Sequence, residues 1–357
     1  MKRILITGGC GFIGSSLAVD LLGRGFAVTV LDNLSRHGSD ILRERVLGRG
    51  ARFVHGDVRD PGVFEKLPED YALMVMCSGE ASAMAGMQGQ GAGSLLDVNL
   101  LGAIHCFEWA RERRVAVIFL SSSRVYPYAR LNACRYEEGL TRFDFIDGCP
   151  GVSRSGVSVQ MPLSGPRSFY GASKLSAEIV LQEYAAQYGL AAIINRCGVV
   201  SGPWQLGKAE QGVFAFWMAN HYFKKSLSYI GFGGTGKQVR DLLHVDDLAA
   251  LVHRQVLALT EEKRPCRGDI FNVGGSSRAS ASLLETTVLC AQMTGNDVPV
   301  GRVLENRAGD MVWYITDNGV TEETFDWRPL KSVEQILGDV YGWMRGHEAE
   351  CRRIFYS

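Results

Sequence analysis

The sequence lacks an excess of charge of either sign. Lys and Arg total 38, and Asp and Glu also total 38, in a chain of 357 residues. A protein that grips DNA or RNA needs a positive field over much of its surface, so this balance argues against a nucleic-acid partner. Charged residues make up 21% and hydrophobic residues 46% of the chain, which is the composition of a folded globular protein.

Long hydrophobic runs and paired cysteines are also missing. No apolar run approaches the roughly 18 residues that indicate a membrane span. The first residues, MKRILITGG, run directly into a strand and a glycine turn, without the apolar core of a signal peptide. The nine cysteines are scattered singly with no CxxC pair, which argues against a disulfide framework or a zinc cluster. We therefore expect a soluble cytoplasmic protein with no metal site and no membrane partner.

Short apolar strands alternate with amphipathic helices in the first half of the chain. We expect strands at residues 3–7, 27–31, 52–54, 72–76, 115–120 and 191–196. Helices are expected between them, at residues 12–22, 94–113 and 170–188. Continuously apolar strands separated by helices are typical of a parallel sheet covered on both faces. The prediction is an α/β fold built on a doubly wound parallel Rossmann sheet.

The pattern loosens after Gly202 and indicates a smaller, mixed α/β C-terminal domain that would bind the substrate. We expect helices at 214–223, 245–259, 282–293 and 333–343 and a strand at 270–273. Residues 1–200 would form the cofactor-binding domain and residues 201–357 the substrate domain, although strands near 240 and 270 could return to the first sheet. Residues 126–168 show no period, and we interpret them as an active-site loop region.

Three glycines and an aspartate indicate a dinucleotide site. Gly8, Gly11 and Gly14 lie where the first strand turns into the first helix, so backbone N–H groups and the positive helix end can bind a pyrophosphate. Asp32 ends the second strand, where a carboxylate accepts hydrogen bonds from a ribose diol. Asp32 favours NAD, because it would repel the extra phosphate of NADP, whereas Arg36 could bind that phosphate. After the third strand, Asp57 is predicted to meet the adenine, with a surface turn as the alternative.

Tyr170 and Lys174 form the second candidate pair. One helical turn separates them, so both side chains lie on one face. A tyrosine titrates near pH ~10, so its use as a base requires nearby positive charge, which Lys174 and an oxidised nicotinamide would supply. Residues 121–123 are serines that end the strand 115–120, where a hydroxyl can hydrogen-bond the reacting oxygen. Simple capping of the strand end is the alternative.

Several segments together resemble the extended short-chain dehydrogenase/reductase family of nucleotide-sugar epimerases and dehydratases: TGGCGFIG, LDNLSR, HGDV, SSSRVY, YGASK, GKQVRDLLHVDD and FNVGG. Within that family, DNLSRHGSD, AEQGVFAFW and GKQVRDLLHVDDL most resemble the CDP-paratose (CDP-tyvelose) 2-epimerase branch. The resemblance implies an isomerase with tightly bound NAD that epimerises a nucleotide-diphosphate sugar, at carbon 2, through a keto intermediate. It also implies a homo-oligomer, either a dimer or a tetramer.

The resemblance assigns a role to each matching position. Ser123 would bind the sugar oxygen, Tyr170 would be the acid/base, and Lys174 would hold the nicotinamide ribose. The implied cofactor-binding residues are Gly8, Gly11, Phe12, Ile13, Gly14, Asp32, Asn33, Ser35, Arg36, Asp57, Val58, Asn99, Ser121, Tyr170 and Lys174. The implied substrate-binding residues are Glu80, Ser123, Gln211, Gly212, Arg240 and Arg307. The two arginines would grip the diphosphate, because a guanidinium makes bidentate charged hydrogen bonds with phosphate.

Three departures from the family pattern keep alternatives open. Glu80 stands where the family usually has a neutral glutamine, which would add a carboxylate near the active-site rim. The segment SSSRVYP is one residue shorter than the family form SSTxxVYG, so either Ser122 or Ser123 could be the reacting serine. The 4,6-dehydratases place an Asp-Glu pair directly after that serine, whereas Arg124 and Val125 follow here, so dehydration lacks its acid and base unless Glu80 substitutes. A 4-epimerase or a uronate decarboxylase stays open, and a non-catalytic NAD-binding regulator is less favoured.

Overall fold

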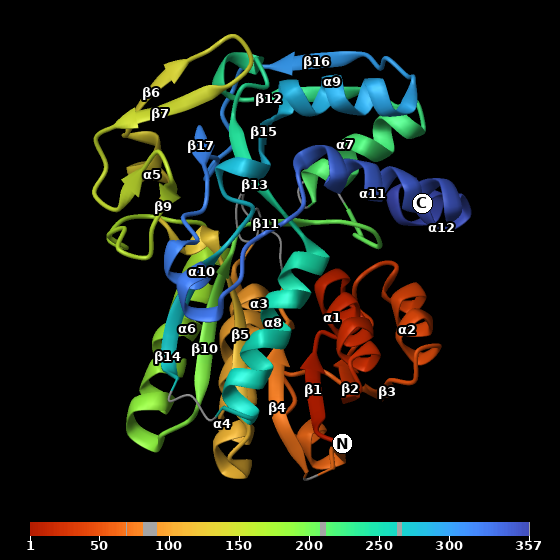
Figure 1. Cartoon of the computed structure of the whole chain (residues 1–357), viewed down its shortest axis with the longest axis vertical. Helices are drawn as coiled ribbons and strands as arrows, with labels where there is room; N and C mark the ends of the chain where they lie inside the picture. Colours follow the sequence, from red (N-terminus) through yellow and green to blue (C-terminus); the bar gives the residue numbers. More distant parts are fainter. Residues whose placement is uncertain (69, 81–90, 208–211, 263–265, 357) are drawn as a thin grey trace.

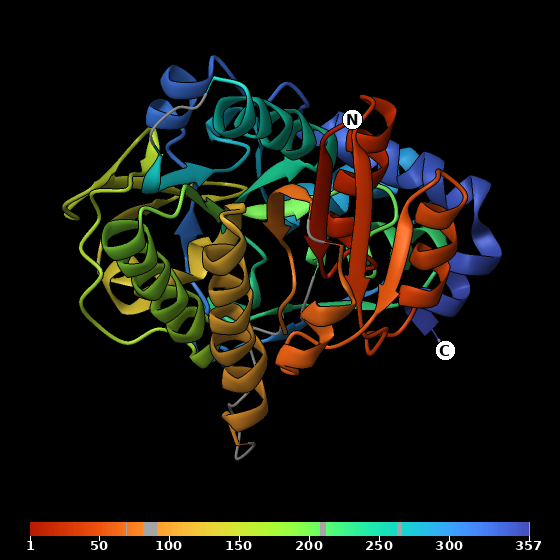
Figure 2. The same ribbon diagram turned by 90° about the horizontal axis from the view of Figure 1, so that it is seen from below.

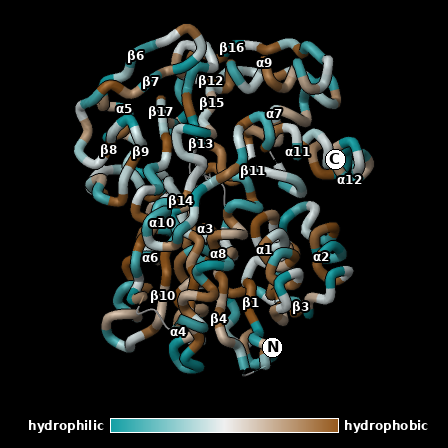
Figure 3. The backbone as a smooth tube through the Cα atoms, in the orientation of Figure 1, coloured by the Kyte–Doolittle hydropathy of each residue, from teal (hydrophilic) through white to brown (hydrophobic). Residues whose placement is uncertain are grey.

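Seven short apolar strands form the central sheet of this protein, whose computed structural model describes residues 1–357 except 69, 81–90, 208–211, 263–265 and 357. All seven are parallel, in the order β14-β10-β5-β4-β1-β2-β3. Their bounds are β1 Arg3–Thr7, β2 Ala27–Asp32, β3 Arg52–His55, β4 Tyr71–Met76, β5 Ala116–Ser122, β10 Ala192–Cys197 and β14 Arg267–Val273. Every residue of β5 and β10 is buried, and most of their residues are apolar, as expected for strands covered on both faces (Figure 3).

Helices cover both faces of this sheet (Figure 2). The side chains of Ile4 and Ile6 pack with α1 (Phe12–Gly23) and α8 (Val245–Thr260). Leu5, which points to the opposite face, packs with α4 (Gly102–Arg113) and α6 (Phe169–Tyr188). The predicted doubly wound α/β fold is confirmed. Among the described helices, none has the length and apolar content needed to cross a bilayer.

Smaller sheets stand above the central one in Figure 1. Four strands form one of them: β11 Val199–Ser201, β13 Val239–His244, β15 Ser280–Ser282 and β17 Trp313–Tyr314. A parallel pair, β12 Leu227–Ile230 and β16 Val300–Val303, forms another. A third hydrophobic core fills this upper part with side chains from four helices: α7 Val213–Tyr222, α9 Leu283–Thr294, α11 Val333–Gly346 and α12 Glu348–Tyr356.

The chain passes more than once between the central sheet and the upper part, which holds the smaller sheets. The strand expected near 270 does return to the central sheet as β14, which pairs with β10. The strand near 240 does not return, because β13 pairs with β11, β15 and β17 in the upper part. The remaining α-helices are α2 Ser39–Leu47, α3 Gly93–Leu96, α5 Tyr128–Asn132 and α10 Gly319–Phe325. Short helical turns lie at η1 Pro61–Lys66, η2 Asp97–Leu101, η3 Ser123–Val125, η4 Phe232–Gly234 and η5 Ser277–Ala279.

Residues 126–168 are more regular than the sequence predicts. They contain α5 and two antiparallel hairpins, made by β6 Arg135–Glu138 with β7 Phe143–Asp147 and by β8 Val152–Ser153 with β9 Gly156–Val157. The first hairpin packs on Trp313, whose ring stacks on Phe145 at 5.5 Å between centroids. Because most residues of these strands are exposed or half-buried and the strands are short, they leave no hydrophobic period in the sequence.

One hairpin also corrects the expectation that the cysteines stay unpaired. Cys134 precedes β6 and Cys149 follows β7, and the two form a disulfide with their Cα atoms 5.5 Å apart. The antiparallel pairing of Arg135 with Asp147 brings the flanking cysteines together. Cysteine spacing could not show this, since the two residues lie 15 positions apart and meet only through the hairpin.

We predict that seven thiols will react with a thiol reagent in the denatured, unreduced protein, because seven cysteines lie outside this disulfide. Prior reduction should raise the count to nine. Nine reactive thiols without reduction would show that Cys134 and Cys149 are not bonded in the purified protein.

Candidate active site

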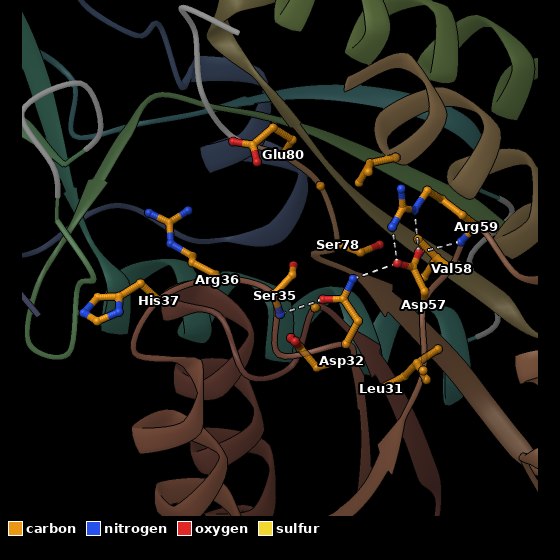
Figure 4. A pocket seen from close by; sticks show the side chains of 15 residues that line it. Leu31, Asp32, Ser35, Arg36, His37, Asp57, Val58, Arg59, Ser78 and Glu80 are labelled. Atoms are coloured by element: carbon orange, nitrogen blue, oxygen red, sulfur yellow. Dashed lines mark hydrogen bonds and ion pairs between the residues drawn. The ribbon is translucent and has the colours of Figure 1, made fainter. Parts of the chain in front are cut away.

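Three cavities lie side by side at the carboxyl ends of the central strands, where a doubly wound sheet binds its ligands. Asp32, Asp57 and Glu80 line the outer cavity (Figure 4). The central cavity, of about 370 Å³, is lined by the glycine loop and Tyr170. The upper cavity, also of about 370 Å³, is lined by Arg240 and others. The outer and central cavities share Asp32 and Arg36, and the central and upper cavities share Arg124 and Gly212, so one continuous site runs between the two parts.

The glycine loop is built for close backbone contact. Gly8 has a φ of +68°, and a Cβ atom there would lie 2.6 Å from the Ser78 backbone nitrogen. A Cβ atom on Gly14 would lie 2.2 Å from the Gly8 carbonyl oxygen. Helix α1 begins at Phe12, and Gly11, Phe12, Ile13 and Gly14 line the central cavity. This loop therefore presents the N-terminus of a helix to a ligand, which suits a pyrophosphate.

Asp32 is held in place at the end of β2. One carboxylate oxygen accepts a hydrogen bond from the Cys10 N–H at 2.9 Å, and the other accepts one from the Leu34 N–H at 2.8 Å. Burial raises the pKa of Asp32. Arg36 donates a hydrogen bond to the Leu206 carbonyl oxygen at 2.9 Å and points into the outer cavity on the same side as Glu80 (Figure 4). The Asp32 carboxylate therefore stands where a ribose diol would lie, which favours NAD over NADP.

The outer cavity also gathers the other residues predicted to meet the adenosine. Asn33 donates a hydrogen bond to the Asp57 carboxylate at 2.8 Å, and Ser35 and Val58 line the same cavity. Arg59, which the sequence analysis missed, binds Asp57 with its Nη2 atom at 2.6 Å. This guanidinium holds the pKa of Asp57 well below its usual range.

Tyr170 lies in the first turn of α6, which begins where the Ser168 hydroxyl accepts a hydrogen bond from the Gly171 N–H. Its side chain lines the central cavity with Ser122 and Ser123. Burial raises the pKa of Tyr170, while a hydrogen bond from Ser122 and the charge of Arg124 lower it. The structure thus brings Ser122 to the tyrosine hydroxyl, and Ser123 follows it in the next turn.

Lys174 lies behind the tyrosine and not on the cavity surface. It is 5% exposed, donates a hydrogen bond to the Leu120 carbonyl oxygen at 3.1 Å, and stands 4.8 Å from the centre of the Phe119 ring. Burial lowers the pKa of Lys174 to about 8. A bound nicotinamide ribose would have to draw this ammonium toward the cavity for Lys174 to take its expected role.

Asn99 lies within the helix expected at 94–113, which is helical throughout but changes to a π-helical turn near its start. A π-helical turn, Asp97–Leu101, separates α3 from α4 and places Asn99 fully inside the protein. The Asn99 side chain accepts a hydrogen bond from the Glu80 N–H at 2.7 Å and donates to the Glu80 carbonyl at 3.0 Å and to the Ser173 hydroxyl at 3.1 Å. Asn99 therefore fixes the loop after β4 against α6. Glu80, expected at the substrate, lines the outer cavity with Asp32 and Asp57.

A buried clamp of three residues, Ser121, Glu178 and Arg196, lies beneath the site and was missed by the sequence analysis. Glu178 follows Lys174 by one turn of α6 and is 0% exposed. Its carboxylate accepts a hydrogen bond from Arg196 Nη2 at 2.7 Å and another from the Ser121 hydroxyl. The clamp ties α6 to β5 and β10. Ser121, expected to bind the cofactor, lines the central cavity and donates its hydroxyl to Glu178.

The upper cavity carries the predicted arginines. Arg240, on β13, donates from Nη2 to the Asp310 carboxylate at 2.6 Å and to the Met311 carbonyl at 2.7 Å. Burial lowers the pKa of Arg240. Arg307 and Gly212 line the same cavity, and Gln211 lies outside the described residues. Two guanidinium groups thus face one cavity, an arrangement that suits a diphosphate.

Comparisons with known proteins agree with this geometry. The model of the NAD dependent epimerase/dehydratase family matches residues 4–274. CDP-paratose 2-epimerase of Salmonella typhi is 30% identical over 96% of this chain and 98% of that protein. A UDP-glucose 4-epimerase of Neisseria meningitidis is 27% identical over 96% of this chain and 97% of its own. The crystal structure of a Thermus thermophilus UDP-glucose 4-epimerase with NAD superposes with a TM-score of 0.76 at 26% identity, covering 97% of this chain and 99% of the other.

The fold and the site define an enzyme built on a Rossmann sheet, with a glycine loop and Tyr170 lining one cavity. More particularly, the chain belongs to the NAD dependent epimerase/dehydratase family of nucleotide-sugar enzymes. Its cofactor is NAD, and the Gly8–Gly14 loop and Asp32 fit that dinucleotide. When bound, NAD supplies a group that accepts a hydride from the substrate and can return it.

Glu178→Gln should lower the free energy of unfolding by about 3 kcal/mol, because Arg196 would keep a buried charge without its counter-ion. The matched control is Glu183→Gln, an exposed glutamate on the same helix, which should change it by less than about 0.5 kcal/mol. Urea unfolding measures both. Equal stabilities of the two variants would contradict the role given to the clamp.

The purified protein should carry NAD in near-stoichiometric amount, and Asp32→Ala should weaken NAD binding roughly tenfold or more, because the ribose diol loses a charged acceptor. Asp144→Ala, an exposed change on β7, is the control and should retain NAD. The cofactor is released by denaturation and identified by chromatography. Finding NADP there would show that Arg36 controls the ribose pocket.

Proposed function

We propose that this protein epimerises a nucleotide-diphosphate sugar at carbon 2 through a keto intermediate, with NAD retained throughout. One observation carries the proposal: the Tyr170–Ser122 pair lies between the glycine loop and the cavity of Arg240 and Arg307. A sugar joined to a diphosphate in the upper cavity would reach this pair. The similarity to a CDP-paratose 2-epimerase supports carbon 2 as the reacting position.

In the proposed chemistry the site's own residues move the proton, and NAD, when bound, would take up the hydride from the carbon and return it. Ser122 would hydrogen-bond the reacting sugar hydroxyl, and Tyr170 would remove its proton as the carbon is oxidised to a ketone. Burial raises the pKa of Tyr170, and the positive charge of Arg124 opposes part of that rise. After the sugar turns over in the cavity, Tyr170 would return the proton to the new alcohol. The overall reaction then has no net oxidation.

The same residues disfavour the alternatives. Dehydration requires an acid and a base beside the sugar, but Arg124 and Val125 occupy η3 directly after the serines. The Glu80 carboxylate, which could have replaced that pair, belongs to the outer cavity with Asp32 and Asp57. A 4-epimerase uses the same tyrosine chemistry at another carbon, so product analysis has to separate it from a 2-epimerase.

We also propose that the protein assembles as a homo-oligomer through the outer face of its helical layer. Four exposed apolar side chains lie on or beside α4 and α6: Leu96 at 36%, Leu101 at 44%, Ile179 at 54% and Tyr188 at 64% exposure. Apolar side chains gathered on adjacent helices favour contact with a second copy of the same surface.

Tyr170→Phe should keep fold and NAD but lower turnover by at least about a hundredfold, because no group remains to take the hydroxyl proton. Tyr188→Phe, an exposed change at the end of the same helix, should leave turnover unchanged. Steady-state rates of the two variants make the comparison. Wild-type turnover by Tyr170→Phe would remove Tyr170 as the base.

Incubation with a panel of CDP-, UDP-, GDP- and dTDP-sugars should give a product inverted at carbon 2, as read by NMR. Inversion at carbon 4 would instead assign a 4-epimerase, and a 4-keto product that has lost water would assign a dehydratase. Binding of NAD without turnover of any sugar in the panel would favour the non-catalytic regulator.

A further inference from the structure

Arg124 lies at the junction of the central and upper cavities. The proposed chemistry uses this residue only for the effect of its positive charge on the pKa of Tyr170. Arg124 lies in η3, directly after Ser122 and Ser123, at the carboxyl end of β5. Its side chain lines both the central cavity, with Tyr170, and the upper cavity, with Arg240. The diphosphate would lie in the upper cavity and the reacting carbon beside Tyr170 in the central cavity. The sugar ring, which joins the two, would therefore occupy this junction.

The position of Arg124 is fixed at both ends of the residue. A Cβ atom on Gly171 would lie 2.1 Å from the Arg124 carbonyl oxygen, so its backbone packs against the first turn of α6, beside Tyr170. At the other end, Nη1 donates a hydrogen bond to the Gly309 carbonyl oxygen at 2.9 Å. Gly309 belongs to the same loop as Arg307 and Asp310. These two contacts hold the Arg124 guanidinium beside the position proposed for the sugar.

The diphosphate already has two arginines of its own. Arg240 and Arg307 line the upper cavity, and Asp310 offsets part of the positive charge of Arg240. Arg124 is a third cation, and it stands on the side of Tyr170. A neutral sugar offers a guanidinium only uncharged hydroxyl acceptors, whereas a carboxylate matches its planar pair of N–H donors with two charged oxygens.

We propose that Arg124 selects a sugar that carries a carboxylate, so that the substrate is a nucleotide-diphosphate hexuronic acid. This inference rests on the proposed function, which supplies the nucleotide sugar and its place at Tyr170. The Arg124 fork binds the carboxylate, and Arg240 and Arg307 bind the diphosphate. Arg124 thus acts as a specificity-determining residue, and the acid pair of a dehydratase at the same place would repel this substrate.

The test measures binding to the NAD-loaded Tyr170→Phe protein, in which turnover does not interfere. Matched pairs of ligands differ only in oxidation of the terminal carbon, for example UDP-glucuronate with UDP-glucose and GDP-mannuronate with GDP-mannose. Calorimetry gives the ratio of the two dissociation constants in each pair. For the nucleotide that the protein prefers, we expect the uronate ligand to bind about tenfold to a hundredfold more tightly than the matching neutral sugar.

Adding Arg124→Gln should bring this ratio close to one, and Arg124→Lys should restore part of it, because charge returns without the fork. Arg240→Gln is the matched control and should weaken both ligands of a pair by the same factor. A uniform loss with Arg124→Gln, or tighter binding of the neutral sugar, would overturn the inference and leave the proposed function standing. Failure of every nucleotide sugar to bind while NAD stays bound would overturn both.

Discussion

The buried ion pair of Glu178 with Arg196 is the constraint on which the proposed reaction centre depends. Glu178 lies one turn along α6 from Lys174, and its carboxylate also accepts a hydrogen bond from Ser121, the residue before Ser122. The pair therefore sets how α6 meets β5, and with it the contact between Tyr170 and Ser122. A buried pair of this kind contributes little net stability over an apolar contact, but breaking it is costly. Its value lies in holding one geometry at the end of two buried strands.

Charge is divided along the continuous site according to what each cavity binds. Carboxylates of Asp32, Asp57 and Glu80 line the outer cavity, where ribose hydroxyls need acceptors. Guanidinium groups of Arg124, Arg240 and Arg307 line the upper cavity, where a diphosphate needs donors. Tyr170 stands between these regions. Arg36 and Arg59 also line the outer cavity and Asp310 also lines the upper one, so carboxylates outnumber guanidinium groups in the first cavity and the reverse holds in the second. The neutral overall composition hides this uneven distribution.

Features that depend on local pattern could be predicted from the sequence. The parallel strands, the glycine loop and the Tyr170–Lys174 spacing each follow from periodicity or from a few adjacent residues. Features that depend on distant partners could not. The Cys134–Cys149 bond requires a hairpin, the clamp joins residues 121, 178 and 196, and Asn99 acts through a π-helical turn. The position of Ser122 at Tyr170 also needed the structure, because a one-residue gap leaves the motif ambiguous.

The central claim is that one site takes a hydroxyl proton and a hydride from a single sugar carbon centre and returns both to it. The most direct measurement is a crossover experiment with substrate deuterated at the reacting carbon, mixed with unlabelled substrate that differs in a remote position. The account predicts that the epimer keeps its deuterium at that carbon and that the unlabelled sugar gains none. Loss of deuterium to water, or its transfer to the second sugar, would contradict it.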